Sequence, residues 1–262
     1  MSEAVAQSAL ACAADRVFLT AARAARDALA DDVSGSRLVD LVADSLQFVD
    51  GLVHDGVATS PADERPVCCA GCAACCHLHA VASPPEVIAI ARHVERAFSD
   101  EARAALEHRI DAHILATQGL SAEQRRQVRS PCPLLVDDRC SVYQVRPISC
   151  RGWNSLDRGV CDADLADPAR GTPARLSLIQ YVLAGRVAEG LAAASCALGL
   201  EHRPLDLVRG LQTALADSGH AERAWRAGTG VFRGAVNDEV FPGPGDPEEV
   251  RARALLWSRL DE

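Results

Sequence analysis

The sequence contains no lysine, and all 27 of its basic residues are arginine. Reactions that need a lysine Schiff base and phosphate-binding loops that need a lysine are therefore excluded. The formal net charge of −9 argues against a general nucleic-acid-binding protein, because such proteins need excess positive charge to displace counterions from phosphates. The motifs H-E-x-x-H and G-x-S-x-G and the P-loop are also missing.

No segment reaches the 18 or more apolar residues that a membrane span needs. The longest apolar window, 176–200, is interrupted by Gln180, Arg186 and Glu189. The first residues include Glu3 and no basic run, so they do not resemble a secretory signal. We therefore expect a cytoplasmic protein that binds neither membrane nor nucleic acid. In a reducing cytoplasm, clustered cysteines are more often metal ligands or catalytic thiols than disulfides.

Helical periodicity dominates the chain, and we expect a mostly α fold: a single helical domain with an embedded irregular cysteine-rich metal-binding module and little strand. We divide it into an N-terminal helical segment (1–60), a metal-binding module with inserted helices (61–165) and a C-terminal helical region (166–262). Residues 55–66 should be a loop, and Asp162 and Asp164 are typical of turns and solvated loops.

Helix starts can be placed from capping residues. Ser83, Pro84 and Glu86 have the identities favoured at N-cap, N1 and N3. In contrast, residues 134–143 predict a short hairpin that turns at Asp137 and Asp138. The predicted helices cover residues 1–30, 36–54, 84–98, 99–118, 121–129, 204–217, 219–227 and 246–260. Ser36 is the predicted cap of the second of these helices. A further long helix is predicted to begin at 172 and to include Leu176.

Cysteine is the unusual feature, because nine of the 11 cysteines lie between Cys68 and Cys161. A spacing of two residues lets two thiolates converge on one ion, and Gly71 gives the backbone freedom that such a turn needs. A C-x2-C-x2-C run is also the three-ligand part of the bacterial ferredoxin motif. Cys12 and Cys196 stand alone on predicted helices and should be small buried apolar residues. The predicted metal ligands are Cys69, Cys72, Cys75, Cys76, Cys132, Cys140, Cys150 and Cys161.

These cysteines and their surroundings resemble the YkgJ-like cysteine-cluster family, whose core is a zinc- or iron-chelating domain called CxxCxxCC. The resemblance covers about 68–153. It rests on the C-x2-C-x2-C-C run at 69–76, the S-x-x-E helix start at 83–86, and C-P-L-L followed by C-S-V-Y-x2-R-P-x2-C-R within 132–151. It implies metal binding, with iron–sulfur clusters in some members. One branch is a flagellin lysine methylase, but that activity is not carried over, because the chain has no glycine-rich cofactor loop.

The candidate thiolates outnumber the four that one zinc ion or one 4Fe–4S cluster binds. Either two metal centres or one cluster with spare thiols is therefore expected. Cys75 and Cys76 cannot easily reach the same ion, because neighbouring side chains diverge. The preferred cluster ligands are Cys69, Cys72 and Cys75 with one downstream cysteine such as Cys150, and the remainder are Cys76, Cys132, Cys140 and Cys161.

Arg146 and Arg151 lie close to the second cysteine block and are candidate cofactor-binding residues. They would offset the negative charge of a four-thiolate centre, and hydrogen bonds from them to sulfur would tune its reduction potential. Their alternative role is that of solvated or salt-bridged structural arginines. His77 and His79 are alternative ligands in place of a thiolate, whereas Tyr143 should pack over the site.

Three functions agree with this pattern. The preferred one is an iron–sulfur protein, with a 4Fe–4S cluster, that acts as an oxidoreductase or metal-dependent modifying enzyme on an unknown substrate. The second is a protein-interaction module that structural zinc holds together. The third is metal storage or delivery. Excess thiolates favour the first and third functions, whereas closed coordination by four thiolates would favour the second.

Overall fold

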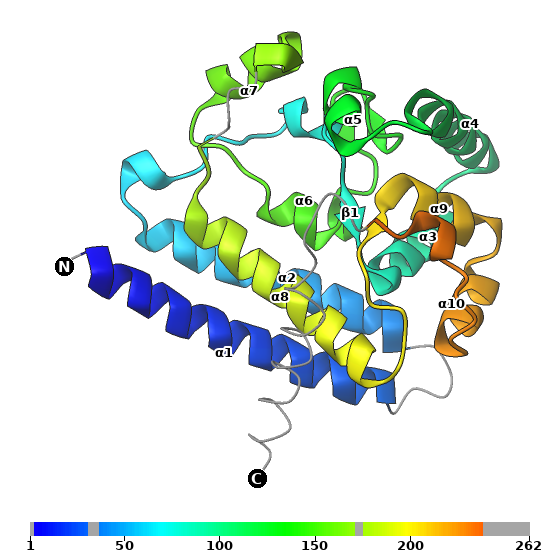
Figure 1. Cartoon of the computed structure of the whole chain (residues 1–262), viewed down its shortest axis with the longest axis horizontal. Helices are drawn as coiled ribbons and strands as arrows, with labels where there is room; N and C mark the ends of the chain where they lie inside the picture. Colours follow the sequence, from blue (N-terminus) through cyan, green and yellow to red (C-terminus); the bar gives the residue numbers. More distant parts are fainter. Residues whose placement is uncertain (1–2, 31–36, 171–174, 238–262) are drawn as a thin grey trace.

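The computed structural model describes residues 3–30, 37–170 and 175–237. Within these ranges the chain is mostly α-helical with a few two-residue strands, which confirms the expected fold class (Figure 1). No helix in the same ranges is long and apolar enough to cross a membrane. The helices are α1 (Glu3–Ala30), α2 (Arg37–Thr59), α3 (Pro84–Ala97), α4 (Asp100–Thr117), α5 (Ala122–Val128), α6 (Ile148–Gly152), α7 (Arg158–Ala166), α8 (Leu178–Ala197), α9 (Leu207–Ala216) and α10 (Ser218–Arg226).

The three longest helices, α1, α2 and α8, pack side by side in one layer (Figure 1). α8 approaches α1 closely at Gly190. A Cβ atom at this position would lie 2.7 Å from the Cβ of Ala21 and 2.8 Å from the backbone nitrogen of Ala22. The contact between these two helices therefore requires a residue without a side chain. The sequence predicts one apolar stripe on α2, and the structure buries its first five residues, Leu38, Leu41, Val42, Leu46 and Val49. The last two, Leu52 and Val53, are half-buried and pack against the core.

A second group of helices consists of α3, α4, α9 and α10, and α3 joins it to the first layer because it contacts both α2 and α9. The start of α3 is confirmed. Ser83 is the N-cap, Pro84 follows it, and Ser83 and Glu86 exchange the hydrogen bonds of a capping box. Ser99 and Ser121 begin α4 and α5 in the same way, each accepting a hydrogen bond from a backbone N–H of the first turn.

The predicted hairpin is also confirmed. It consists of β2 (Leu135–Val136) and β3 (Arg139–Cys140), which pair antiparallel. Asp137 and Asp138 connect them with φ angles of 49° and 56°. A tight two-residue turn of this kind requires positive φ at both positions, and aspartate tolerates it better than most residues.

A second strand pair was not expected from the sequence. β1 (Val81–Ala82) pairs antiparallel with β4 (Leu205–Asp206), although more than a hundred residues separate them. The Leu207 N–H donates to the Ala80 carbonyl at 3.1 Å and extends the connection. This pairing ties the cysteine-bearing segment to the C-terminal helices. One continuous cluster of buried apolar side chains runs through all three predicted segments.

Several predicted boundaries are wrong. α2 continues to Thr59, so residues 55–59 are not a loop, because Gly56 remains packed against the side chain of Ile179. α8 begins at Leu178, and Leu176 lies before it. Residues 175–177 are held outside the helix, because the Arg175 carbonyl accepts from the Leu156 N–H at 2.8 Å.

The segment 148–166 contains two helices that the sequence pattern did not predict, α6 and α7. Asp162 and Asp164 lie in α7 and not in a loop. The side chain of Asp164 accepts a hydrogen bond from Arg129, so this helix is tied to α5 by a contact that no local pattern indicates. The predicted Ser36 cap, the start of the long helix at 172–174 and the predicted helix 246–260 lie outside the described residues.

The close contact at Gly190 gives a stability prediction. We expect Gly190→Ala to lower the free energy of unfolding by about 1–3 kcal/mol, because the new methyl group would meet backbone atoms of α1 that cannot move aside. Gly185→Ala in the same helix is the matched control. No atom lies within 4 Å of the Cβ that it adds, and it should raise stability by about 0.5–1 kcal/mol. Urea unfolding followed by circular dichroism measures both. Equal effects at the two positions would contradict this packing.

Candidate metal centre

The two cysteine blocks lie next to each other in the folded chain. The Cys132 N–H donates to the Cys76 carbonyl at 2.8 Å, which joins the second block directly to the first. The last cysteines of the first block lie on a short 3-10 helix, η2 (Ala74–His77), and α7, which carries Cys161, packs against it. Before η2, Gly71 has a φ of 80°, and the Cys72 N–H donates to the Cys69 carbonyl at 3.1 Å. The predicted tight turn between these two cysteines is therefore present.

Four cysteines interact with one another through their charges, and we call them the inner group: Cys75, Cys132, Cys140 and Cys150. Burial, together with negative charge on other members of the group, raises the pKa of the Cys132 and Cys150 thiols to about 12. A hydrogen bond with the neighbouring Cys76, followed by burial, also raises the pKa of Cys75. These thiols hold their protons at neutral pH unless a cation compensates the charge of the thiolates.

A second set of cysteines surrounds the start of α7, and we call it the outer group: Cys68, Cys69, Cys72 and Cys161. Burial raises the pKa of Cys68, and charges on Cys72, Cys75 and Cys161 act in the same direction. Arg158 joins this group, because its Nη1 lies 3.6 Å from the Sγ of Cys69. Cys68 and Cys69 are exposed, so this group lies at the surface.

The two candidate arginines have different surroundings. Arg151 is buried and donates to the carboxylate of Asp50 on α2 and, at 2.6 Å, to the Gln144 carbonyl. This is the salt-bridged structural role. Arg146 lies above the Tyr143 ring, with 3.9 Å between Cζ and the ring centroid. Its Nε is buried without a hydrogen-bond partner among the described residues. Its charge opposes part of the rise that burial causes in the pKa of Cys140 and Cys150.

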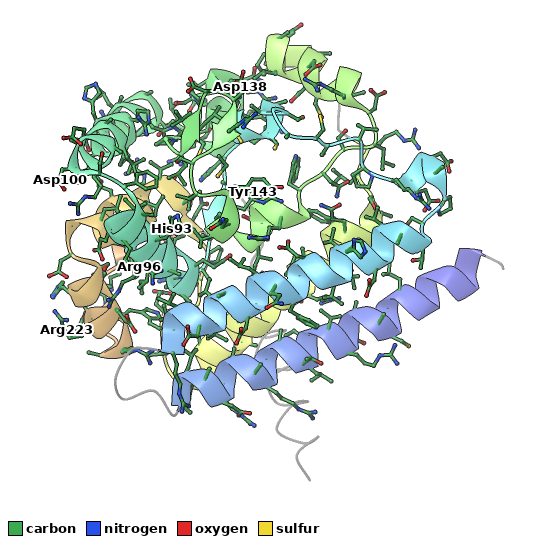
Figure 2. All side chains as sticks on the ribbon, turned by 180° about the vertical axis from the view of Figure 1, so that it is seen from behind. His93, Arg96, Asp100, Asp138, Tyr143 and Arg223 are labelled. Atoms are coloured by element: carbon green, nitrogen blue, oxygen red, sulfur yellow. The ribbon has the colours of Figure 1, made fainter. Side chains whose placement is uncertain are left out.

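Tyr143 itself lies at the surface next to the hairpin. Figure 2 shows it on its short helix in front of α6, with Asp138 at the hairpin tip. The side chain is 59% exposed, so it covers Arg146 on the solvent side. Cys12 and Cys196, which lie away from both blocks, are exposed and half-buried respectively. The expectation that both are buried is wrong for Cys12, which occupies the solvent face of α1.

Cys150 is held in place by hydrogen bonds to the helical frame. Glu86 on α3 is buried, and its Oε1 accepts from the Ile148 N–H at 2.7 Å, at the start of α6. Its Oε2 accepts from the Ser83 N–H at 2.7 Å. Ser149 donates through Oγ to the Val81 carbonyl at 2.5 Å. One carboxylate thus caps α3 and fixes the helix that carries Cys150.

The alternative ligand His79 is held by a polar cluster that the sequence did not indicate. Its Nε2 lies 3.2 Å from Oδ2 of Asp206, and Arg125 donates to the same oxygen at 2.7 Å. Burial disfavours the charged form of Asp206. Hydrogen bonds from His79, the Arg209 N–H and Arg125 outweigh this effect and hold the pKa of Asp206 well below its usual range. The other candidate, His77, has Nδ1 at 3.2 Å from the Ala73 carbonyl.

The donor atoms fit a metal that prefers sulfur. Both groups offer thiols, and each has an arginine beside it, including the buried Arg146 Nε without a partner. No three histidine, cysteine or acidic side chains in the described part of the chain stand close enough together to hold an ion as they are. The metal-ligand role of the predicted cysteines stays a prediction.

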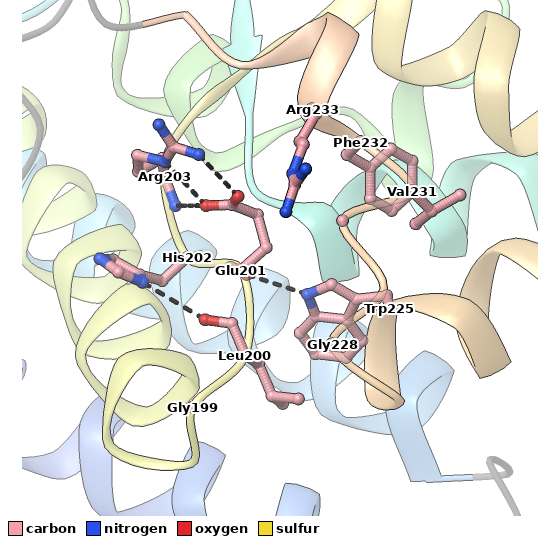
Figure 3. A pocket seen from close by; sticks show the side chains of 11 residues that line it. Gly199, Leu200, Glu201, His202, Arg203, Trp225, Gly228, Val231, Phe232 and Arg233 are labelled. Carbon is pink, nitrogen blue, oxygen red and sulfur yellow. Dashed lines mark hydrogen bonds and ion pairs between the residues drawn. The ribbon is translucent and has the colours of Figure 1, made fainter.

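A hollow of about 340 Å³ lies far from both groups, between the loop after α8 and the residues after α10 (Figure 3). Glu201 and Arg203 form a hydrogen-bonded pair at its side, and the Trp225 Nε1 donates to the Glu201 carbonyl at 2.9 Å. Arg233 extends into the hollow from the opposite side. No cysteine lines it, so it has no part in the candidate metal centre.

Residues 68–163 match the family model CxxCxxCC, described as "Putative zinc- or iron-chelating domain". The matched segment includes every predicted cysteine ligand and also Cys68, and it confirms the family resemblance read from the sequence. The match supports metal binding by this segment. The comparisons with curated proteins and with solved structures gave no match.

The contacts of Glu86 give a second stability prediction. Glu86→Gln should lower the free energy of unfolding by about 1–3 kcal/mol, because an amide group places a donor against donors and leaves a buried N–H without its partner. Glu107→Gln on the exposed face of α4 removes the same charge and should change stability little. Urea unfolding of the two variants under the same metal conditions tests this. Identical unfolding midpoints would show that Glu86 does not hold α6.

Proposed function

We propose that the protein binds an iron–sulfur cluster, preferably 4Fe–4S, on the cysteines between residues 68 and 161, and that it acts in redox or metal-assisted modification of a substrate. The observation that carries the proposal is the gathering of thiols from both blocks next to arginines. Such a cluster would supply electron transfer when bound. Its ligands would come from the predicted cysteines.

The chain's own residues have defined tasks in this proposal. The thiols release their protons and bind iron, which compensates the repulsion that raises their pKa values. Arg158 donates a hydrogen bond to a cysteine sulfur, an interaction of the kind that tunes reduction potential. Arg146 reduces the net negative charge of the bound cluster and its thiolate ligands. Cys69 is exposed, so an electron donor could approach the site from this side.

Two alternatives use the same thiols. Structural zinc would hold the blocks together for protein contacts, and four-thiolate coordination with no open position would favour it. Metal storage or delivery would use the excess of thiols and the exposure of the first block. The three functions differ in metal identity and in sulfide content.

Metal analysis of anaerobically purified protein tests the proposal. We expect a brown protein with broad visible absorption that contains iron and acid-labile sulfide. Cys12→Ala is the matched control, because this cysteine lies outside both groups, and it should retain the full iron and sulfide content. A colourless protein from iron-replete cells, with stoichiometric zinc and no sulfide, would reject the iron–sulfur cluster and favour structural zinc.

A further inference from the structure

The hollow between the loop after α8 and the residues after α10 has walls that hydrogen bonds hold in place. The Leu200 N–H donates to a carbonyl in the last turn of α8 at 2.9 Å, and the Thr229 N–H donates to one in the last turn of α10 at 3.1 Å. The buried indole of Trp225 joins the two walls through its bond to the Glu201 carbonyl. The chain itself therefore fixes the shape of the hollow.

The acidic side chain at the hollow is neutralised by its neighbour. Glu201 accepts from Arg203 through both carboxylate oxygens, at 3.0 Å between Oε1 and Nε and at 2.8 Å between Oε2 and Nη2. These hydrogen bonds lower the pKa of Glu201, so its carboxylate is charged at neutral pH. The pair as a whole adds no net charge to the hollow.

Arg233 is the second cation of the hollow, and its guanidinium extends inward from the side opposite this pair (Figure 3). No hydrogen bond or ion pair joins the guanidinium to another residue of the described ranges. Gly230 allows the side chain to lie there, because a Cβ atom at this position would be 2.7 Å from Nε of Arg233. With the imidazole of His202 neutral, the hollow carries one positive charge that the described residues do not balance.

The rest of the lining is backbone and apolar side chains. Leu200 and Val231 are half-buried, whereas Trp225 and Phe232 belong to the buried wall. The volume of about 340 Å³ lies at the lower end of the range of small-molecule sites, which is about 300–1,000 Å³. A hollow of this size, with apolar walls and one unbalanced cation, has the chemistry of a site for a small organic anion.

From its charge, its lining and its size we propose that the hollow binds a small monocarboxylic acid. The carboxylate pairs with the Arg233 guanidinium, and the apolar part of the acid contacts Leu200 and Val231. One carboxylate matches the one unbalanced charge, whereas a dianionic phosphate group would leave surplus negative charge near the Glu201 carboxylate. The site uses no cysteine, so this inference does not depend on the proposed metal-binding function.

Ligand-observed NMR titration of the full chain, as purified, tests the charge requirement with benzoate and hexanoate and with their neutral amides, benzamide and hexanamide. We expect at least one acid to bind, and its amide to bind about 10–100-fold more weakly, because the amide loses the charge-assisted hydrogen bonds to Arg233. Phenyl phosphate should bind more weakly than benzoate. The inference is overturned if neither acid binds, if acid and amide bind equally, or if phenyl phosphate binds more tightly.

Substitutions then place the acid in the hollow. Arg233→Gln should weaken acid binding about 10–100-fold. Arg223→Gln is the matched control, because this arginine is exposed on α10 and lies outside the lining, and it should leave acid binding unchanged. An acid that binds both variants equally is bound elsewhere, for example to a metal at the cysteines, and this result would contradict the proposal.

Gly230→Ala tests the position of the guanidinium without removing its charge. The added methyl group would displace the Arg233 side chain, so acid binding should weaken several-fold. Gly119→Ala is the matched control, because φ is 72° at Gly119 and 71° at Gly230, and no atom lies within 4 Å of the Cβ that it adds. Equal affinity of the two variants for the acid, with their helical circular dichroism signals intact, would show that Arg233 does not hold the carboxylate.

Discussion

The burial of several thiols beside one another is the constraint on which the arrangement of residues 68–161 depends. Burial makes the thiols of Cys132 and Cys150 difficult to ionise, and each additional thiolate nearby raises the free-energy cost of ionising them. The charges of Arg146 and Arg158 oppose part of this cost, and a metal bound in the proposed way would offset the rest by taking the place of the protons.

The helices around this segment do not depend on the same interaction. α1, α2 and α8 bury their own apolar side chains, and they pack closely through Gly190. The frame reaches the cysteine segment through the shared apolar core and also through polar contacts, notably Glu86 at the start of α6 and the ion pair between Asp50 and Arg151. Each buried charged side chain in these contacts has a hydrogen-bond partner, and this limits the free energy that its burial costs. The frame therefore positions α6 and with it Cys150.

The sequence predicted the features that local chemistry determines. Ser83 and Glu86 identify the start of α3, and the pair Asp137–Asp138 identifies the hairpin turn, because each signal lies within a few residues. The spacing of the cysteines is also a local signal, and it identified the candidate ligands.

The sequence did not predict the features that depend on contacts between residues far apart in the chain. The pairing of β1 with β4, the caps on Asp206 and the true start of α8 depend on residues far away in the chain. The contact of Arg158 with Cys69 spans 89 residues and has no local signature.

Hydrogen exchange with and without metal tests most directly the claim that metal organises the cysteine segment while the helical frame is independent of it. The account predicts that a chelator removes protection from residues 67–78 and 132–161 and leaves α1, α2 and α8 protected, because their hydrogen bonds are internal and their packing needs no metal. Protection lost evenly along the chain would contradict the account, since it would show that the frame folds only with the metal.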